Sequence, residues 1–413
     1  MKRTIWTDEA HAVDDGEWDE GLIDPCNKFP AHIMRGWDRD FVELYADRLE
    51  SPPQFFWGSY MACVGAIVAP KIRFDLAINT PIRVYILLLG ESADSRKSTA
   101  MEQTEKLFLR AYDGKFCFTY GVNSGVGLRQ VLEKQPSTIL DYDEFRQFLK
   151  VSSYSNSDLL DLVTQLYSRD VAESHKSDNH VVIRNVHLSL LAACTLKTYS
   201  HVYDGDAIDI GFSNRVFIIP GRRTERKPFP RSFGDTELAP LLNAITKIEA
   251  IPAKTYSPTQ NAVKIFSDWY RGYEISDFSK RIEDYAMRFM TLLAVVRGES
   301  VVTDTIVLDT IDLINWQIKM RSQYDPVDAD GMLAKMEGKI VGLLRSNETV
   351  SYWDLFRKTG ARRCGIEVFD RALNTLVEHE IISGTRQKNY KTKSYKLLYD
   401  TELTAMYSHI LQP

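Results

Sequence analysis

The sequence predicts an α/β protein with a mostly parallel sheet, followed by a helical region and a small basic domain. Runs of β-branched and aliphatic residues alternate with helical patterns between residues 82 and 219, which is typical of a parallel sheet. The length of 413 residues favours two to three domains. With 44% hydrophobic and 26% charged residues, the composition excludes a disordered or collagen-like chain.

The first elements are two helices and a central strand. Apolar residues recur at three- and four-residue steps over 38–50 and 54–68, and residues 51–53 (Ser-Pro-Pro) separate the two segments. The apolar run 82–89 ends at a glycine and suits a strand that is buried on both faces. Further strands are expected at 116–120, 137–141, 186–193 and 215–219, with helices at 99–112, 126–134 and 158–168.

The chain changes character after Pro220. A basic, proline-marked connector leads to a mainly helical pattern over 237–323. The last segment predicts a helix, a short strand, two helices and a basic hairpin, which is the order of a winged helix. These last elements are expected at 332–344, 350–351, 352–358, 365–379, 381–386 and 394–399. We therefore divide the chain into an acidic tail (1–30), an N-terminal helical region (31–80), a core (81–225), a helical domain (226–328), a winged helix (329–400) and a C-terminal tail (401–413).

Charge is distributed unevenly along the chain. Residues 1–30 carry eight acids and three bases, a net charge of −5, whereas residues 332–400 carry thirteen Lys/Arg and eight Asp/Glu, a net charge of +5. The pattern indicates a basic module that meets phosphates and an acidic tail for a protein partner, with a solvated surface as the alternative. No secretory signal or bilayer-spanning run is visible, so we expect a cytoplasmic protein without membrane contact.

A candidate phosphate-binding loop follows the strand predicted at 82–89. Residues 90–99 read Gly-Glu-Ser-Ala-Asp-Ser-Arg-Lys-Ser-Thr and lead into a helix, which is the context of a P-loop. Backbone N–H groups there bind phosphate oxygens, Lys97 would reach the β- and γ-phosphates of ATP, and Ser98 would supply a hydroxyl to Mg²⁺. The expected nucleotide-binding residues are Gly90, Ser92, Ser95, Arg96, Lys97, Ser98 and Thr99.

This loop departs from the pattern G-x4-G-K-[ST] in two ways. Lys97 is the seventh residue after Gly90, whereas the pattern has the lysine as the sixth, and Arg96 replaces the second glycine. Because that glycine serves a turn with positive φ or a close backbone approach, we expect Asp94 or Ser95 to adopt the strained geometry. The alternative is an ordinary helix start capped by Ser or Asp.

An acidic pair follows the strand predicted at 137–141. Asp143 lies 46 positions after Lys97, and Glu144 is the next residue. In a P-loop site one aspartate holds the Mg²⁺ shell while an adjacent glutamate polarises the attacking water. We assign Asp143 to the metal and Glu144 to catalysis. Asp141 is the competing acid, or a cap of the following turn.

Two polar positions complete the expected catalytic set. Thr195 follows the strand predicted at 186–193, where a sensor of the γ-phosphate would lie, and capping is its alternative role. Arg215 begins the next strand and is a candidate arginine finger for the nucleotide of a neighbouring subunit, with a surface ion pair as the alternative.

Two other patterns carry no expected site. Residues 121–127 are rich in glycine but lack a lysine, and we interpret them as a capped turn that opens a helix at Ser124. The eight histidines and five cysteines form no closely spaced metal-binding pair, so neither a zinc site nor a disulfide framework is expected.

Taken in this order, the loop, acid pair, polar sensor and arginine resemble a helicase-like P-loop family of phages and mobile elements. The resemblance covers roughly residues 29–320 and implies a P-loop NTPase (RecA/AAA+-like) core that binds ATP and Mg²⁺. The basic C-terminal module resembles the winged helix of MCM-like replicative helicases. The matching segments are Phe29-Pro30, the helical part 38–68, Arg96-Lys97-Ser98, Asp143-Glu144 and Gly211-Phe212…Arg215.

The predicted partner is single-stranded or forked DNA. Cations with an interleaved tyrosine, Tyr390, fit phosphate contacts and base stacking, although winged helices also serve as protein–protein modules. A polar insertion at 170–180, with His175 and Lys176, is expected to be a surface loop, or alternatively a pore or DNA-contacting loop. The candidate DNA-binding residues are Arg362, Arg363, Arg371, Arg386, Lys388, Lys391 and Lys393.

We therefore expect an ATP-driven DNA motor that acts as a ring-shaped homo-oligomer on a phage or mobile element. The alternative is a nucleotide-gated DNA-binding or partner-recruiting protein, such as an initiator, loader or defence component, without unwinding activity. A purely structural DNA-binding protein is the third hypothesis.

Overall fold

The structure is a computed structural model, and its described part has several gaps. It describes residues 28–77, 80–91, 95–152, 154, 157–176, 179–196, 198–199, 211–223, 225–273, 275–325, 329–345, 349–361, 365–379, 381–386 and 393–398. No helix within these residues is both long and apolar enough to span a bilayer.

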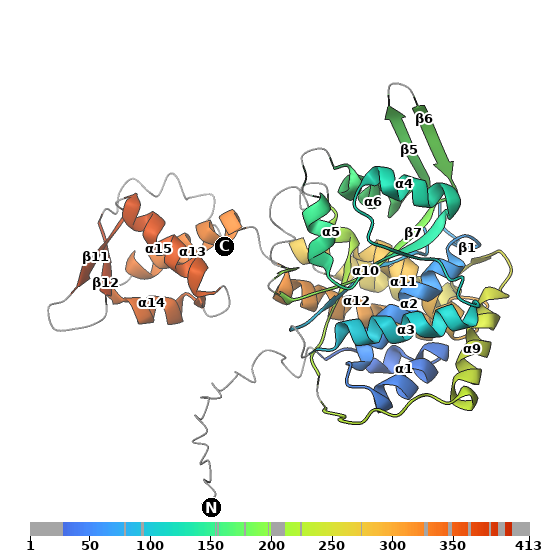
Figure 1. The fold of residues 1–413 in the computed structure, drawn as a ribbon. Coiled ribbons are helices and arrows are strands. Elements are labelled where there is room, and N and C mark those ends of the chain that lie inside the picture. The colour runs from blue at the N-terminus through green and yellow to red at the C-terminus, as the bar shows by residue number, and fades with distance from the viewer. Residues whose placement is uncertain are drawn as a thin grey trace, which may run out of the picture. The chain divides into compact units, whose positions relative to one another are not determined.

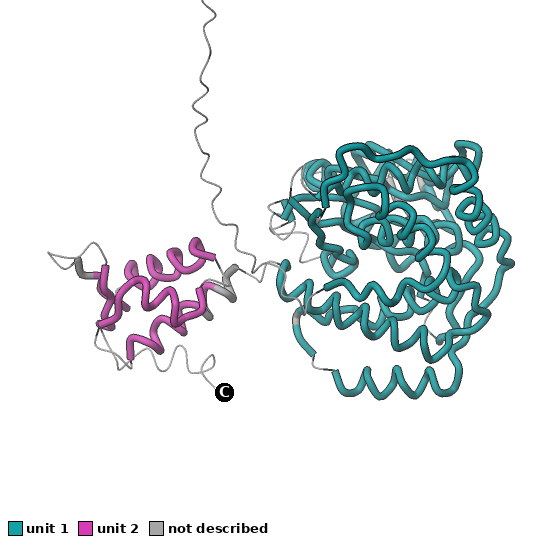
Figure 2. The backbone as a smooth tube through the Cα atoms, turned by 90° about the horizontal axis from the view of Figure 1, so that it is seen from below, with its two compact units in different colours: residues 1–325 teal, residues 326–413 magenta. Residues whose placement is uncertain are grey.

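The chain divides into two compact units, residues 1–325 and residues 326–413 (Figure 2). Each unit has its own cluster of buried apolar side chains. In unit 1 the predicted N-terminal helical region, core and helical domain contribute to one shared cluster. The structure thus does not separate residues 31–80, 81–225 and 226–325 into different compact units.

A parallel five-stranded sheet forms the centre of unit 1, as the sequence predicts. The sheet order is β3-β4-β7-β2-β8, and every neighbouring pair is parallel. Buried residues dominate β2, β4, β7 and β8, which explains their near-continuous apolar sequences. The strands are β2 (Tyr85–Leu89), β3 (Phe118–Tyr120), β4 (Ser137–Tyr142), β7 (His187–Cys194) and β8 (Phe217–Pro220).

The connecting helices cover both faces of this sheet (Figure 1). The β2–β3 connection crosses the sheet in one direction, whereas the β3–β4, β4–β7 and β7–β8 connections all cross in the other direction. Because such crossovers are right-handed, α3 lies on one face and α4, α5 and α6 lie on the opposite face. These helices are α3 (Lys97–Ala111), α4 (Gly125–Lys134), α5 (Phe145–Ser152) and α6 (Leu159–Leu166).

Helix α2 (Pro53–Val68) is the central helix of unit 1, and it begins at Pro53, one residue before the predicted start at 54. Every residue from 55 to 66 is buried, because the helix contacts β2, β4, β7 and β8 on one side and α1, α3 and α9 on others. A helix that is apolar all round belongs in such a position. The preceding α1 (Trp37–Arg48) packs against it.

The region after the sheet is mainly helical, in agreement with the sequence prediction. The helices are α9 (Asp235–Glu249), α10 (Gln260–Gly272), α11 (Ile282–Val296) and α12 (Asp304–Tyr324), with short 3-10 turns at Ala31–Ile33, Ser213–Arg215 and Asp277–Ser279. Two three-residue strands, β1 (Ile72–Phe74) and β9 (Lys254–Tyr256), form a separate parallel pair that the sequence did not predict.

The polar insertion between α6 and β7 is a β-hairpin, so its interpretation as an irregular surface loop is wrong. Strands β5 (Val171–Lys176) and β6 (Asn179–Arg184) pair antiparallel along six register positions. Figure 1 shows the hairpin projecting beyond α4 and α6. Its base lies next to the first residue of β7, and therefore at the amino edge of the central sheet.

Unit 2 contains the elements that the sequence predicts, in the predicted order. Its three-stranded antiparallel sheet has the order β10-β12-β11 and packs with three helices around a small apolar core. The elements are α13 (Ala329–Arg345), β10 (Val350–Ser351), α14 (Tyr352–Lys358), α15 (Ile366–Glu378), β11 (Ile382–Arg386) and β12 (Lys393–Leu397).

Candidate phosphate-binding site

The candidate site lies at the carboxyl edge of the central sheet. Leu89, at the end of β2, pairs in register with Cys194 of β7 and with Pro220 of β8. The amide of Gly90 donates to the carbonyl oxygen of Cys194 at 3.3 Å. The connections after β2 and β7 leave toward opposite faces, and the crevice at such a switch point is where open α/β sheets bind ligands.

The Lys97 side chain folds back over the start of its own loop. Its ammonium donates to the carbonyl oxygens of Gly90 (2.8 Å) and Glu91 (3.1 Å) and to the Ser95 hydroxyl (3.0 Å). Lys97 is also the first residue of α3, where the leading N–H groups have no partner within the helix. The ammonium and these N–H groups together form a cationic, donor-rich end of the helix that suits an anion.

Arg96 supplies the backbone turn for which the sequence offers no glycine. Its φ of +53° and ψ of +35° place it in the left-handed region, at the position of the second glycine of the standard loop. Our expectation that Ser95 could adopt this geometry is wrong, because Ser95 has no positive φ; Asp94 lies outside the described residues.

Glu50, two residues after α1, holds this turn in place. Its carboxylate accepts hydrogen bonds from Arg96 Nε at 2.8 Å, from Arg223 Nη1 at 2.9 Å and from the Lys227 amide at 2.8 Å. The Lys227 amide and the Arg223 guanidinium, followed by that of Arg96, lower the pKa of Glu50 to about 2. The neighbouring Ser51 hydroxyl donates to the Arg96 carbonyl oxygen at 2.8 Å.

Sequence reasoning did not identify Glu50 or Ser51, because no short motif joins them to a loop 45 residues later. The only signal was their place at the boundary between two predicted helices. Gly90 was identified, and the structure gives the reason for a glycine there. A Cβ at Gly90 would lie 2.5 Å from Ser95 Oγ and 2.6 Å from the Gly221 carbonyl oxygen.

Glu144 lies close enough to Lys97 to influence its protonation. Burial lowers the pKa of Lys97, and the nearby Cys194, Glu144 and Glu91 act in the opposite direction. The buried Cys194 thiol confirms the grouping: burial raises its pKa to about 12, the Lys97 charge lowers it, and the Glu144 charge raises it further. The structure therefore brings the loop lysine and the acid pair to the same edge of the sheet.

Asp143 and Glu144 are exposed residues between β4 and α5. Asp141, the competing acid, lies within β4 and caps no turn in the described part of the chain. Its Oδ2 is buried without a hydrogen-bond partner. Burial, with smaller contributions from Glu105 and Asp143, raises the pKa of Asp141 to about 7. An uncompensated buried carboxylate of this kind lowers the stability of the folded protein, and Asp141 stays the competing acid for the metal.

Thr195 lies beside the loop, and its hydroxyl acts as a cap. Its Oγ1 accepts a hydrogen bond from the Thr198 amide at 3.1 Å and donates to the Thr198 hydroxyl. The capping alternative is thus confirmed for this structure. Because Thr195 follows the β7 residue that pairs with Leu89, its position next to Gly90 also agrees with the expected sensor position.

Arg215 is not part of this cluster. It precedes β8, and its pKa is lowered by burial and by Arg281, with Tyr167 and Tyr85 close by. Tyr85 is the first residue of β2, whereas the candidate phosphate-binding loop follows the last residue of the same strand. Five residues of strand span about 16 Å, so Arg215 lies at the opposite edge of the sheet and cannot reach the loop of its own chain.

The donor set for a divalent cation is limited. Ser98 at the start of α3 and Asp143 after β4 provide a hydroxyl and a carboxylate at the same edge of the sheet. Within the described residues, no group of three or more His, Cys, Asp or Glu side chains could hold a metal ion by itself. The two residues fit Mg²⁺, which proteins commonly bind through one or two side chains together with substrate phosphates.

The basic residues of unit 2 are only partly described. Arg371 is exposed on α15, on the side away from the buried Phe369, Ala372 and Leu373. Arg386 and Lys393 pair in register where the hairpin strands β11 and β12 approach their connecting loop, and Lys393 is exposed. Ser92 of the loop and Arg362, Arg363, Lys388 and Lys391 lie outside the described residues.

The turn at 121–127 is a capped helix start, as interpreted from the sequence. The Ser124 hydroxyl accepts a hydrogen bond from the Gly127 amide at 3.0 Å, and α4 begins at Gly125.

The chain matches no family model and no curated protein sequence. The resemblance to the helicase-like P-loop family therefore stays a prediction, and the functional argument rests on the geometry of the site.

Proposed function

We propose that this protein is an ATP-dependent DNA motor with a P-loop NTPase core and a C-terminal winged helix. The observation that carries the proposal is the grouping of Lys97 and Glu144 around Cys194 at the carboxyl edge of a parallel sheet. Lys97 lies at a helix N-terminus after β2, and Glu144 follows β4, which is two positions from β2 in the sheet. A lysine and an acid in this arrangement are the two charges that phosphoryl transfer to water requires.

In the proposed reaction, the loop after β2 binds the triphosphate of ATP. The three hydrogen-bond partners of Lys97 are weak acceptors compared with phosphate, so the ammonium exchanges them for the β- and γ-phosphate oxygens. Ser98 and Asp143 would hold Mg²⁺, which would supply positive charge to the phosphate oxygens. Glu144 accepts the proton of a water whose oxygen attacks the γ-phosphorus. The bond to the bridging oxygen breaks, and ADP and inorganic phosphate leave.

The amino edge of the sheet carries the parts that we assign to DNA and to the neighbouring subunit. The β5–β6 hairpin projects from this edge, and we propose that it contacts DNA, with His175 and Lys176 near its tip. Arg215 lies at the same edge and serves as an arginine finger for the nucleotide of the next subunit in a ring, which agrees with its distance from its own loop.

The first experiment is an ATPase assay with and without single-stranded and forked DNA. We expect turnover that DNA stimulates. Both Lys97→Ala and Glu144→Gln abolish it, and Glu144→Gln retains ATP binding because it leaves the loop intact. Lys106→Ala is the matched control, since this exposed lysine of α3 pairs with Glu102 and with no other described residue. DNA-independent turnover, or turnover that survives Lys97→Ala, overturns the motor.

The neighbour role of Arg215 is tested by mixing variants. Lys97→Ala subunits lack a working site but carry Arg215, whereas Arg215→Ala subunits carry a working site but lack the finger. If the finger acts in trans, each variant alone is inactive and mixed oligomers regain part of the activity. If Arg215 has only a structural role, mixing restores nothing.

The proposed winged helix is tested through the salt dependence of DNA binding. Arg371→Ala and Lys393→Ala remove exposed charges, so each is expected to weaken DNA binding and to reduce the slope of log affinity against log salt by about 1. Lys339→Ala removes an exposed charge from α13 and should change the slope less. If all three variants have the same salt slope as wild type, the result would indicate that unit 2 binds a protein instead of DNA.

One observation favours the alternative, a nucleotide-gated protein without unwinding activity. Arg96 occupies the turn normally made by glycine, and its guanidinium binds Glu50, which ties this end of the loop to the segment after α1. ATP binding with no turnover under any DNA condition would support this switch.

A further inference from the structure

A cavity in unit 1 lies next to the candidate phosphate-binding loop. It has a volume of about 360 Å³, within the usual range for small-molecule pockets. Four segments line it: the chain before α1, the start of α2, the end of β8 and the last turns of α12. The lining residues that matter for the argument are Phe29, Gln54, Pro220, Arg222, Trp316 and Tyr324.

Two chain segments that hydrogen-bond to the loop or to the strand before it also line this cavity. Gly221 donates its amide to the Leu89 carbonyl oxygen at 2.9 Å, and its own carbonyl oxygen lies against Gly90. Pro220 and Arg222, which flank Gly221, line the cavity. On the other side Ser51 donates to the Arg96 carbonyl oxygen, and the next residues, Pro52 to Gln54, line the cavity as well. The cavity is therefore lined by residues adjacent in sequence to Gly221 and Ser51, the two residues that contact the loop or the strand before it.

The chemistry of the lining suits a flat heteroaromatic ring. Phe29 packs edge-on against Trp316 with ring centroids 5.0 Å apart, and Tyr324 and three prolines add further apolar surface. Arg222 lies near enough to Tyr324 to lower the pKa of its phenol, although burial dominates and raises it. Aromatic and proline faces with an arginine at the mouth are the groups that stack on a nucleobase and contact a ribose or phosphate.

Gln54 gives the cavity a preference among bases. Its Nε2 donates to the Pro220 carbonyl oxygen at 3.2 Å, which fixes the orientation of the amide. Its Oε1 makes no hydrogen bond within the described part of the chain and remains as an acceptor. A fixed acceptor pairs with an exocyclic amino group, as on adenine, and meets the O6 carbonyl of guanine unfavourably.

We propose that this cavity binds the adenine base of the nucleotide whose phosphates occupy the loop, and that Gln54 selects adenine over guanine. The inference rests on the proposed function, because it requires the triphosphate to bind at residues 90–98.

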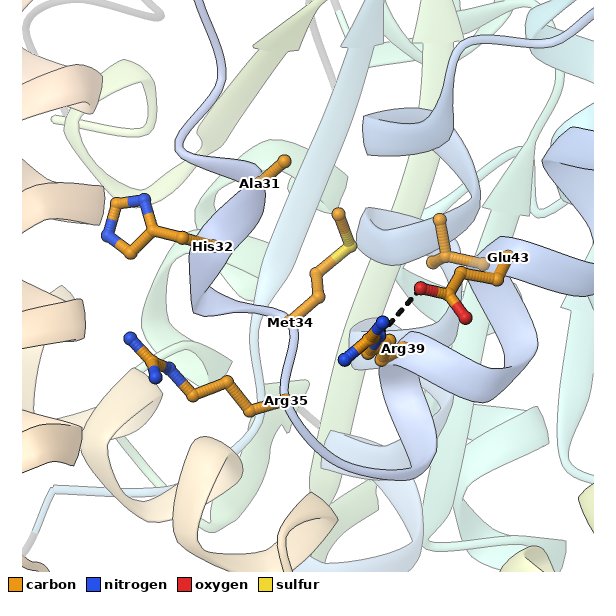
Figure 3. Close-up of a pocket in the computed structure, with 7 residues that line it drawn as sticks. Ala31, His32, Met34, Arg35, Arg39 and Glu43 are labelled. Carbon is orange, nitrogen blue, oxygen red and sulfur yellow. Dashed lines mark hydrogen bonds and ion pairs between the residues drawn. The ribbon is translucent and has the colours of Figure 1, made fainter.

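The other cavity near the N-terminal segment is less suited to a charged ligand. It is lined by Ala31, His32, Met34, Arg35, Arg39 and Glu43, among others (Figure 3). Its charged groups are already paired with acids: Arg35 binds Asp309 at 2.8 Å, Arg39 binds Glu43 at 2.6 Å and His32 contacts Asp312 at 2.9 Å. The cations of this cavity are thus already bound to acids of the protein. The cavity beside the loop, in contrast, offers the Gln54 Oε1 acceptor to a ligand.

The test compares the binding of ATP, GTP and inorganic tripolyphosphate to wild type, Lys97→Ala and Gln54→Leu by titration calorimetry with Mg²⁺ present. Gln54→Leu has a shorter, apolar side chain and removes both the Oε1 acceptor and the Nε2 donor. We expect wild type to bind ATP about tenfold more tightly than GTP, an advantage that Gln54→Leu loses. Tripolyphosphate should bind wild type and Gln54→Leu equally, and Lys97→Ala should weaken all three ligands.

A second readout locates the base directly. Photolabelling with 8-azido-ATP, followed by mass spectrometry, should modify peptides that contain residues 28–34, 220–223 or 316–324. Equal affinities for ATP, GTP and tripolyphosphate, or labelling confined to other peptides, would overturn the base pocket and leave the phosphate site intact. If wild type binds neither ATP nor tripolyphosphate, the proposed function itself fails.

Discussion

The Arg96 guanidinium and the Glu50 carboxylate form a 2.8 Å ion pair between the candidate phosphate-binding loop and the turn after α1. Arg96 has left-handed backbone angles that an arginine adopts at a cost of roughly 1–2 kcal/mol. The pair, together with the Ser51 hydrogen bond to the Arg96 carbonyl oxygen, offsets part of this cost. The turn that glycine makes in a standard loop is here stabilised by side-chain contacts from another element.

A glycine should therefore be tolerated at this turn. Arg96→Gly removes the backbone strain and the ion pair together, so we expect the free energy of unfolding to stay within about 1 kcal/mol of wild type, with ATP binding retained. Arg96→Val keeps the strain, adds a β-branched side chain and loses the ion pair, so it should be the more destabilised variant. Denaturant titrations of both proteins measure the difference, and the reverse order of stabilities would refute the role of the turn.

The Glu50 network predicts a specific acid dependence. The pKa of Glu50 is lowered from 4.5 to about 2, so its stabilising contribution is complete above pH 4.5 and is lost as the pH falls toward 2. Urea midpoints of wild type and Glu50→Gln should differ by a constant amount above pH 5, and the gap should narrow steadily between pH 4.5 and 2. A gap that does not change with pH would mean that the charge of the Glu50 carboxylate does not stabilise the folded protein.

Gly90 is expected to accept no side chain. In Gly90→Ala the new Cβ meets Ser95 and the Gly221 carbonyl oxygen at 2.5–2.6 Å, so backbone must shift and stability should fall by about 1–3 kcal/mol. Gly272→Ala is the control, because a Cβ at this end of α10 meets nothing within 4 Å. Thermal unfolding compares the two variants, and similar losses in both would show that close packing around Gly90 is not required.

Replacing Asp141 should stabilise the folded protein in alkaline solution. Its folded-state pKa of about 7 lies above the ordinary value of 3.8, so wild type loses stability as the pH rises from 4 to 7 and bears the full penalty above pH 7. Asp141→Asn removes the charge. We expect the variant to be more stable than wild type at pH 8, by on the order of 1–3 kcal/mol, and similar to it near pH 4. A variant that is less stable at pH 8 would indicate that the carboxylate has a stabilising partner.

The elements with strong local signals were predicted well. The strands around 85–89, 137–142 and 187–194 have continuous apolar sequences, and the two prolines before residue 54 place the start of α2 to within one residue, so local sequence identifies these elements. The parallel sheet and the edge that gathers Gly90, Asp143 and Thr195 follow from the same alternation of strand and helix.

The features that the sequence could not predict depend on partners far along the chain. The hairpin over 171–184 has a polar sequence without clear alternation, and the β1–β9 pair joins segments about 180 residues apart. The buried Arg83 donates to the carbonyl oxygens of Leu166 and Val186, which only the folded chain brings together. The unusual backbone conformation of Arg96 is similarly accompanied by contacts with Glu50 and Ser51, which lie more than 40 residues earlier in the chain.

The most direct measurement is calorimetric titration of Mg²⁺-ATP into wild type, Lys97→Ala and Lys106→Ala. If the loop after β2 binds the triphosphate, wild type and Lys106→Ala bind ATP with the same affinity, whereas Lys97→Ala binds about 10- to 100-fold more weakly because charge-assisted hydrogen bonds to phosphate are lost. Equal binding by all three proteins, or no binding by wild type, would contradict the account.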